Sequence, residues 1–227
     1  MSIFYKFTAL IFCLALASFA NPNKDLFLGT RFEVGPTWYS NSQHFFEEEA
    51  TGVTASLGLF FQIPIAPQIY LRPTVAIKAQ TETYEYDHEV TGSYSTYTQN
   101  EDYTLESQGI DIKFLFHFKT YERTHGFFFD VGPMVSLNTM SDSYVEQDYY
   151  YSETDLNDFV IHEKREFGFV IGGGFALGRR IEMDIHYNKM LTRAYTVQND
   201  DSLLSQANSK AAPRGSSITF GFNFLLF

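Results

Sequence analysis

Apolar and polar residues alternate along most of the chain from about residue 27 to its end. Eight segments show this period of two, with apolar side chains at every second position and polar residues, glycine or charge between them. The segments cover residues 27–39, 51–62, 69–78, 109–119, 126–136, 166–175, 181–188 and 216–227. This alternation predicts β-strands with one apolar and one polar face, so we expect an all-β chain.

The charged residues of these segments share the polar face, and the apolar face carries none. A lysine or arginine that faces lipid near the membrane midplane costs about 2–4 kcal/mol. Buried charges must be paired or hydrated. The pattern therefore predicts a membrane barrel whose interior holds a structural network of ion pairs. The predicted interior residues are Arg31, Glu33, Arg72, Lys78, Asp111, Lys113, Asp130, Glu166, Glu182, Asp184 and His186.

The connections between the segments alternate in length. Short ones cover residues 64–68, 119–125 and 178–180. Long ones cover residues 40–50 and 197–215 and lie within residues 82–106 and 138–163. This order predicts an eight-stranded antiparallel up-and-down transmembrane barrel, with short periplasmic turns, long extracellular loops and both termini in the periplasm. The alternative, a secreted β-sandwich, would place the apolar face in its core and does not require this order.

The first twenty residues predict export. Lys6 ends a short basic start, residues 7–16 are apolar, and Ser18 and Ala20 are the small residues of a cleavage site after Ala20. We expect a signal peptide at residues 1–20, one barrel domain at residues 21–227, and insertion into the outer membrane of a Gram-negative cell. The only cysteine, Cys13, lies in the signal, which excludes disulfides and thiolate metal sites from the mature chain.

The chain combines an export signal, eight alternating strands, inward charges and the terminal sequence "ITFGFNFLLF". In these features it resembles the small outer-membrane barrels typified by OmpX and the OmpA membrane domain. More loosely, it resembles the outer membrane protein beta-barrel family. The resemblance implies a sheet that protrudes beyond the membrane. One position departs from the pattern, because barrels of this class end in an aromatic residue in phase with the apolar face. Here Phe227 is out of phase with Phe220, Phe222 and Phe224.

The predicted outer loops are acidic and rich in tyrosine. Tyrosine provides contact area at low entropic cost, which suits a binding surface. The alternative is that these loops are long, solvated and keep the exterior soluble. The candidate surface residues are Glu47, Glu48, Glu49, Tyr84, Tyr86, Tyr94, Tyr97, Tyr144, Tyr149, Tyr150 and Tyr151. Outer-membrane lipid or lipopolysaccharide, an extracellular protein and a polysaccharide are the expected partners. The net charge of −11 argues against nucleic acid.

The sequence disfavours two other functions, catalysis and conduction through the barrel. The sequence "DIHYNK" resembles the His-x-Ser of the lipid A deacylase PagL, but Asn188 stands at the position of the serine nucleophile. His44 and His88 lack the spacing that would support a scheme like that of the palmitoyl transferase PagP. A narrow channel is also disfavoured, because eight strands enclose a space that side chains fill. We expect a non-enzymatic barrel that displays its acidic, tyrosine-rich loops for adhesion, partner binding or envelope integrity, with no catalytic residues, no metal site and no cofactor.

The sequence Phe-acid-Val-Gly-Pro occurs twice, at residues 32–36 and 129–133. Each copy lies on the first strand of a predicted four-strand half, and a proline inside a strand predicts a bulge or bend. Gly35 and Gly132 are expected to leave room inside for a long side chain from across the barrel. Duplication and convergence both explain the repeat.

Overall fold

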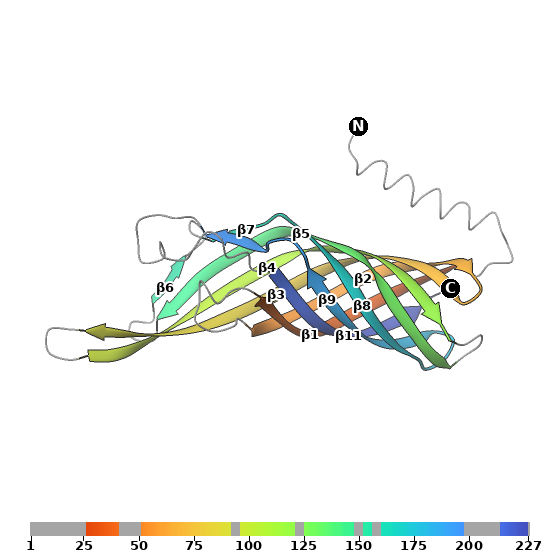
Figure 1. Cartoon of the computed structure of the whole chain (residues 1–227), viewed down its shortest axis with the longest axis horizontal. Helices are drawn as coiled ribbons and strands as arrows, with labels where there is room; N and C mark the ends of the chain where they lie inside the picture. Colours follow the sequence, from red (N-terminus) through yellow and green to blue (C-terminus); the bar gives the residue numbers. More distant parts are fainter. Residues whose placement is uncertain are drawn as a thin grey trace, which may run out of the picture.

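The computed structural model describes residues 26–40, 51–91, 96–120, 125–147, 152–155, 160–197 and 214–226. Eight long strands in these ranges form a barrel (Figure 1). They are β1 (Phe27–Ser40), β2 (Thr51–Ala66), β3 (Ile69–Thr91), β4 (Thr96–Lys119), β5 (Gly126–Gln147), β8 (Arg165–Ala176), β9 (Ile181–Met190) and β11 (Arg214–Leu225). The short strands are β6 (Ser152–Asp155), β7 (Val160–His162) and β10 (Tyr195–Val197). The predicted signal peptide and Phe227 lie outside the described residues.

The barrel strands follow one another around the sheet in the order β4-β3-β2-β1-β11-β9-β8-β5, and pairing of β4 with β5 closes it. All of these pairings are antiparallel. The predicted eight-stranded up-and-down barrel is therefore confirmed. No helix in the described ranges is long and apolar enough to cross a membrane.

The two faces of the barrel wall separate as the alternation predicts. Apolar side chains on the outside are exposed, with Ile77 at 72% and Leu57 at 63% relative exposure. Charged and polar residues fill the inside, where Arg72 and Asp130 are fully buried. This inverts the arrangement of a water-soluble protein, because the solvent of the outer face is lipid.

The two ends of the barrel differ in the length of their connections. Leu226, after β11, is bonded to Leu28, near the start of β1, at the end that also holds the connections at residues 67–68, 120–125 and 177–180. We call this the short-turn end and the opposite end the long-connection end. At the short-turn end β2 runs to Ala66, past its predicted end at residue 62, with a register irregularity after Pro64. Gln68 then adopts a left-handed φ of 63° that permits a tight turn.

Three strands continue beyond the barrel at the long-connection end (Figure 1). Pairing of β2 with β3 ends at Thr83, but β3 remains paired with β4 as far as Thr91. Strand β5 stays paired with β4 to Gln147, and β6 adds to the other edge of β5. We call residues 84–91, 96–103, 144–147 and 152–155 the protruding sheet.

The repeated sequence occupies matching places on β1 and β5. Gly35 and Pro36 have no paired residue on β11, and Gly132 and Pro133 have none on β4. The register on either side of each gap is unchanged, so the predicted bulges are wrong. A proline interrupts the ladder because it has no N–H. A Cβ atom at Gly35 or Gly132 would overlap a backbone carbonyl oxygen of the neighbouring strand, so these glycines admit that strand and not a side chain from across the barrel.

Candidate functional site

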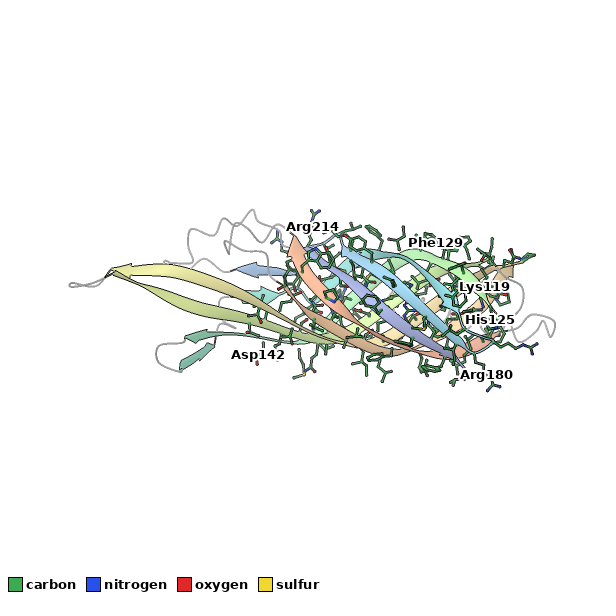
Figure 2. The ribbon with its side chains drawn as sticks, turned by 90° about the horizontal axis from the view of Figure 1, so that it is seen from below. Lys119, His125, Phe129, Asp142, Arg180 and Arg214 are labelled. Atoms are coloured by element: carbon green, nitrogen blue, oxygen red, sulfur yellow. The ribbon has the colours of Figure 1, made fainter. Side chains whose placement is uncertain are left out.

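The lumen holds a network of buried charges. Figure 2 draws the side chains of the barrel as sticks. All eleven residues predicted for the interior are buried, each with at most 5% relative exposure. Their positions follow from strand alternation, because every second residue of a barrel strand faces inward. The acids of the repeated sequence, Glu33 and Asp130, both lie in this network.

Two arginine–histidine arms meet at Asp130 in the centre of the network. Arg31 Nη2 lies 2.9 Å from His186 Nδ1, and His186 Nε2 lies 3.1 Å from Asp130 Oδ2. Arg72 Nη2 lies 3.1 Å from His117 Nε2, and His117 Nδ1 lies 2.7 Å from Asp130 Oδ1. A guanidinium can only donate, so the histidine nitrogen facing it must accept. The other ring nitrogen of each histidine faces Asp130, so His186 uses Nε2 and His117 uses Nδ1 toward the same carboxylate.

Arg31 also binds the carboxylates around it. Its Nη2 donates to Glu33 Oε1 at 2.9 Å and to Asp184 Oδ1 at 2.6 Å, and Lys113 Nζ donates to Glu33 Oε2 at 2.6 Å. Glu33, Asp184 and His186 bring potential metal ligands within 4.8 Å of one another. Arg31 contacts all three, so its guanidinium already occupies the place a cation would take. The cluster is an ion-paired support and does not fit a metal centre.

Arg72 is held near the short-turn end by polar and aromatic side chains. Its Nη2 donates to Glu182 Oε2 and to Gln62 Oε1, both at 2.6 Å. Its guanidinium carbon lies 4.8 Å from the ring centroid of Phe60 and 5.8 Å from that of Phe128. Sequence reasoning missed these inward rings because they sit in unbroken apolar runs, "LFFQ" and "FFFD", which hide the alternation. The alternation of residues 109–119 places His117 on the inward face, but the predicted network did not include it.

The half of the lumen toward the long-connection end has fewer side-chain hydrogen bonds than the half around Arg31, Arg72 and Asp130. Lys78 Nζ donates to Ser136 Oγ at 2.8 Å, and Asn138 Nδ2 donates to Glu166 Oε1 at 2.9 Å. A cavity of about 30 Å³ lies here, lined by Lys78 and Asp111 among others. This volume admits one or two water molecules. Asp111 Oδ1 is buried without a hydrogen-bond partner in the protein, and a water in this polar cavity would satisfy it.

Glu82 does not lie in an outer loop, where the sequence-based expectation placed it. It lies in β3, is buried, and accepts hydrogen bonds from Thr37 Oγ1 at 3.1 Å and Gln80 Nε2 at 2.8 Å. Its chain neighbours on the outer face, Thr81 and Thr83, are polar, so this level lies beyond the apolar band. Burial raises the pKa of the Glu82 carboxyl to about 7, although these hydrogen bonds and the charge of Lys78 favour its ionised form.

Two of the residues considered for catalysis, His186 and Asn188, are bonded to other side chains of the barrel wall. His186 is bonded to Arg31 and Asp130 and not to a hydroxyl group. Asn188 Nδ2 donates to Ser217 Oγ at 3.0 Å and to Thr219 Oγ1 at 3.3 Å. This arrangement provides no nucleophile beside an activating base. His44 lies outside the described residues, and His88 lies in β3.

The candidate binding residues are only partly within the described chain. Tyr84 and Tyr86 lie in β3, Tyr97 in β4 and Tyr144 in β5. Strands β3, β4, β5 and β6 pair in this order, so these tyrosines lie in one sheet. The others are outside the described residues: Glu47, Glu48, Glu49, Tyr94, Tyr149, Tyr150 and Tyr151.

A closed eight-stranded barrel with an apolar outer face and an ion-paired lumen defines an outer-membrane β-barrel. The model of the family described as outer membrane protein beta-barrel domain matches residues 19–194, more than half of the chain. The chain belongs to this family, and the resemblance predicted from the sequence is confirmed.

Solved structures give more distant likenesses. Neisserial surface protein A (NspA) has a TM-score of 0.48 and 14% identity, over 88% of this chain and 97% of that chain. Ail, the attachment invasion locus protein of Yersinia pestis, has a TM-score of 0.36 and 7% identity, over 87% and 98%. Ail in complex with the heparin analogue sucrose octasulfate has a TM-score of 0.36 and 6% identity, over 89% and 99%. No curated protein sequence matches the chain. The fold assignment rests on the strand pairing and the family match.

Proposed function

We propose that the protein is a non-enzymatic outer-membrane barrel that displays the protruding sheet outside the cell to bind a basic partner. In this proposal residues 1–20 direct export and are removed, and residues 21–227 form the barrel. The short-turn end and both termini face the periplasm, and the long-connection end faces outward. Long connections on the outer side are typical of bacterial outer-membrane barrels, which supports this orientation.

The charge of the protruding sheet is the observation that carries the proposal. Its strand segments contain no lysine or arginine. One cross-strand row places acids directly opposite one another on four consecutive strands: Glu85, Asp102, Glu146 and Glu153. Like charges directly opposite destabilise a sheet, by roughly 0.2–1 kcal/mol for each pair. A basic partner would remove this repulsion on binding, so charge complementarity favours a cationic protein segment over an anionic polysaccharide.

The register also places further acids and tyrosines near this row. Asp87 and Glu89 of β3 and Asp155 of β6 occupy alternate positions along the strands from the row of acids. Tyr84 and Tyr103 are directly opposite one another in the next row. Among the described residues, no strand pairs with β3 beyond Thr83 on the side of β2, and an edge of this kind can pair with an extended segment. Charge, tyrosine and an open edge are the features of a peptide-binding platform.

The test is capture by purified barrels that differ only in the protruding sheet. Thr83 and Thr104 are directly opposite, so an Asn-Gly turn can join them in a trimmed variant. A second variant replaces Glu85, Asp102, Glu146 and Glu153 with the matching amides. Immobilised intact barrel should enrich basic proteins that both variants fail to enrich, as measured by quantitative mass spectrometry. Equal capture by the intact barrel and both variants would refute the proposal.

The competing classes predict other phenotypes. A lipid A-modifying enzyme predicts changed lipid A acylation when the gene is deleted, and mass spectrometry of extracted lipid A detects this. We expect no change. The ring nitrogens of buried His186 face Arg31 and Asp130 and not a hydroxyl group, which supports this expectation. A narrow small-solute channel predicts sustained conductance in planar bilayers.

A further inference from the structure

We propose that the lumen cavity of about 30 Å³ toward the long-connection end binds a small monovalent cation of the size of Na⁺. Asp111 of β4 and Asn188 of β9 both line this cavity, and each is only 5% exposed. Asp111 Oδ1 and Asn188 Oδ1 are buried and have no hydrogen-bond partner among the described residues. An ionised carboxylate and an amide oxygen can only accept, so the cavity offers two free acceptors to a ligand.

The orientation of the Asn188 amide follows from the hydroxyl groups beside it. Its Nδ2 donates to Ser217 Oγ at 3.0 Å and to Thr219 Oγ1 at 3.3 Å. Thr219 Oγ1 donates its own hydrogen to Glu33 Oε1 at 3.3 Å. Because that hydrogen is already used, Thr219 can only accept from Asn188. The amide nitrogen therefore faces Thr219, and Asn188 Oδ1 is left without a donor.

The charges around the cavity favour a cation over a neutral ligand. Asp111, Ser136 and Glu166 are directly opposite one another in one cross-strand row. Lys78 Nζ donates to Ser136 Oγ at the middle of this row, so one ammonium group serves two carboxylates. Lys78 also acts electrostatically on Glu82. None of the three acids takes part in the ion pairs found among the described residues.

The other lysine in the lining does not supply the missing positive charge. Lys113 Nζ lies 2.6 Å from Glu33 Oε2, so its charge is balanced by that carboxylate. A buried charge in a folded protein is normally paired or bound to a metal ion. A water molecule in the cavity would give Asp111 Oδ1 a hydrogen bond but no charge. A cation supplies both a ligand for the free oxygens and the charge that Asp111 lacks.

The size and the oxygen atoms of the cavity indicate which cation fits. Carboxylate and amide oxygens suit hard cations. The cavity has room for one or two water molecules, which is too few for Mg²⁺ because that ion keeps several of its waters. Of the two carboxylates in the lining, Glu33 is bonded to Arg31 and Lys113, so Asp111 alone is free to balance a single positive charge. The sequence predicts no metal site, because Asp111 and Asn188 are brought together only by the strand order.

The experiment compares urea unfolding of the purified barrel in uncharged lipid vesicles with different chloride salts. Na⁺, choline, Mg²⁺ and Ca²⁺ are used at equal ionic strength and at slightly alkaline pH, and Trp38, the only tryptophan, reports unfolding. A ligand that binds only the folded state stabilises it more as its concentration rises above its Kd. The urea midpoint should therefore rise with Na⁺ concentration. It should not rise with choline, whose cation is too large for the cavity.

Two results on the parent barrel overturn the proposal. Equal midpoints in all of the salts mean that the cavity holds water alone. A larger rise in Mg²⁺ or Ca²⁺ than in Na⁺ means that the site is not one for a monovalent cation. Broadening of the sodium NMR signal by the folded barrel measures binding directly and should saturate with Na⁺ concentration.

Asp111→Asn locates the site. The amide keeps the size of the side chain and removes its charge, so the rise of the urea midpoint with Na⁺ should be lost. In choline this variant should be at least as stable as the parent, because an unpaired buried charge is gone. Asp142→Asn, the same change at an exposed position of β5, is the matched control and should keep the sodium response. A sodium response that survives Asp111→Asn overturns the inference. Capture of proteins by the protruding sheet is a separate result, because Asp111→Asn leaves that sheet intact.

Discussion

Asp130→Asn is the substitution that tests the lumen network most sharply. The asparagine keeps the shape of the side chain, but it removes the negative charge that faces Arg72 at 3.9 Å. It also replaces one acceptor with an N–H₂ group that faces a histidine N–H. Neither histidine can change tautomer to compensate, since the nitrogen it would protonate faces an arginine donor.

Hydrogen bonds to a charged group contribute about 1.5–3 kcal/mol each. Asp130 accepts two. Breaking a buried ion pair by removing one partner costs about 3–5 kcal/mol. We therefore expect Asp130→Asn to lower the free energy of unfolding by about 3–5 kcal/mol. Urea unfolding in lipid vesicles, followed by Trp38 fluorescence and circular dichroism, measures this. Asp142→Asn, on the exposed face of β5, is the control and should stay within about 0.5 kcal/mol of the parent. A loss below about 1 kcal/mol for Asp130→Asn would refute the two-arm network.

Three further predictions follow from single contacts. Gly35→Ala and Gly132→Ala should each block folding or cost several kcal/mol, because the new Cβ overlaps a carbonyl oxygen; Gly178→Ala, with open space around it, should be neutral in the same urea assay. The pKa of Glu82 is raised to about 7 in the folded barrel, from an ordinary value of 4.5, so its contribution to stability is complete below pH 4.5 and is lost as pH rises through 7. The loss reaches up to about 3 kcal/mol, so Glu82→Gln should remove this pH dependence, and an unchanged profile would contradict the assignment. Phe60→Leu should destabilise the barrel by about 1–2 kcal/mol, in part through the lost contact with Arg72; no change in the urea midpoint would count against that contact.

The barrel and the inward phase of its charges could be predicted from the sequence because both depend on local alternation. The partners of those charges could not. Arg31 binds Asp184, 153 positions away, and only the strand order and register bring them together. Register also creates the row of acids on the protruding sheet. Glu82 was placed wrongly because polar residues occupy both faces of β3 around it, so alternation gives no phase there.

In the proposed function the ion-paired network closes the lumen, and the protein acts through its outer surface. Single-channel recording of the purified barrel in planar bilayers tests this most directly. Arg31→Ala, which removes the guanidinium that binds Glu33 and Asp184, provides a comparison with a weakened network. We predict no sustained conductance from the parent protein and measurable opening in the variant. Sustained conductance from the parent barrel would contradict the account.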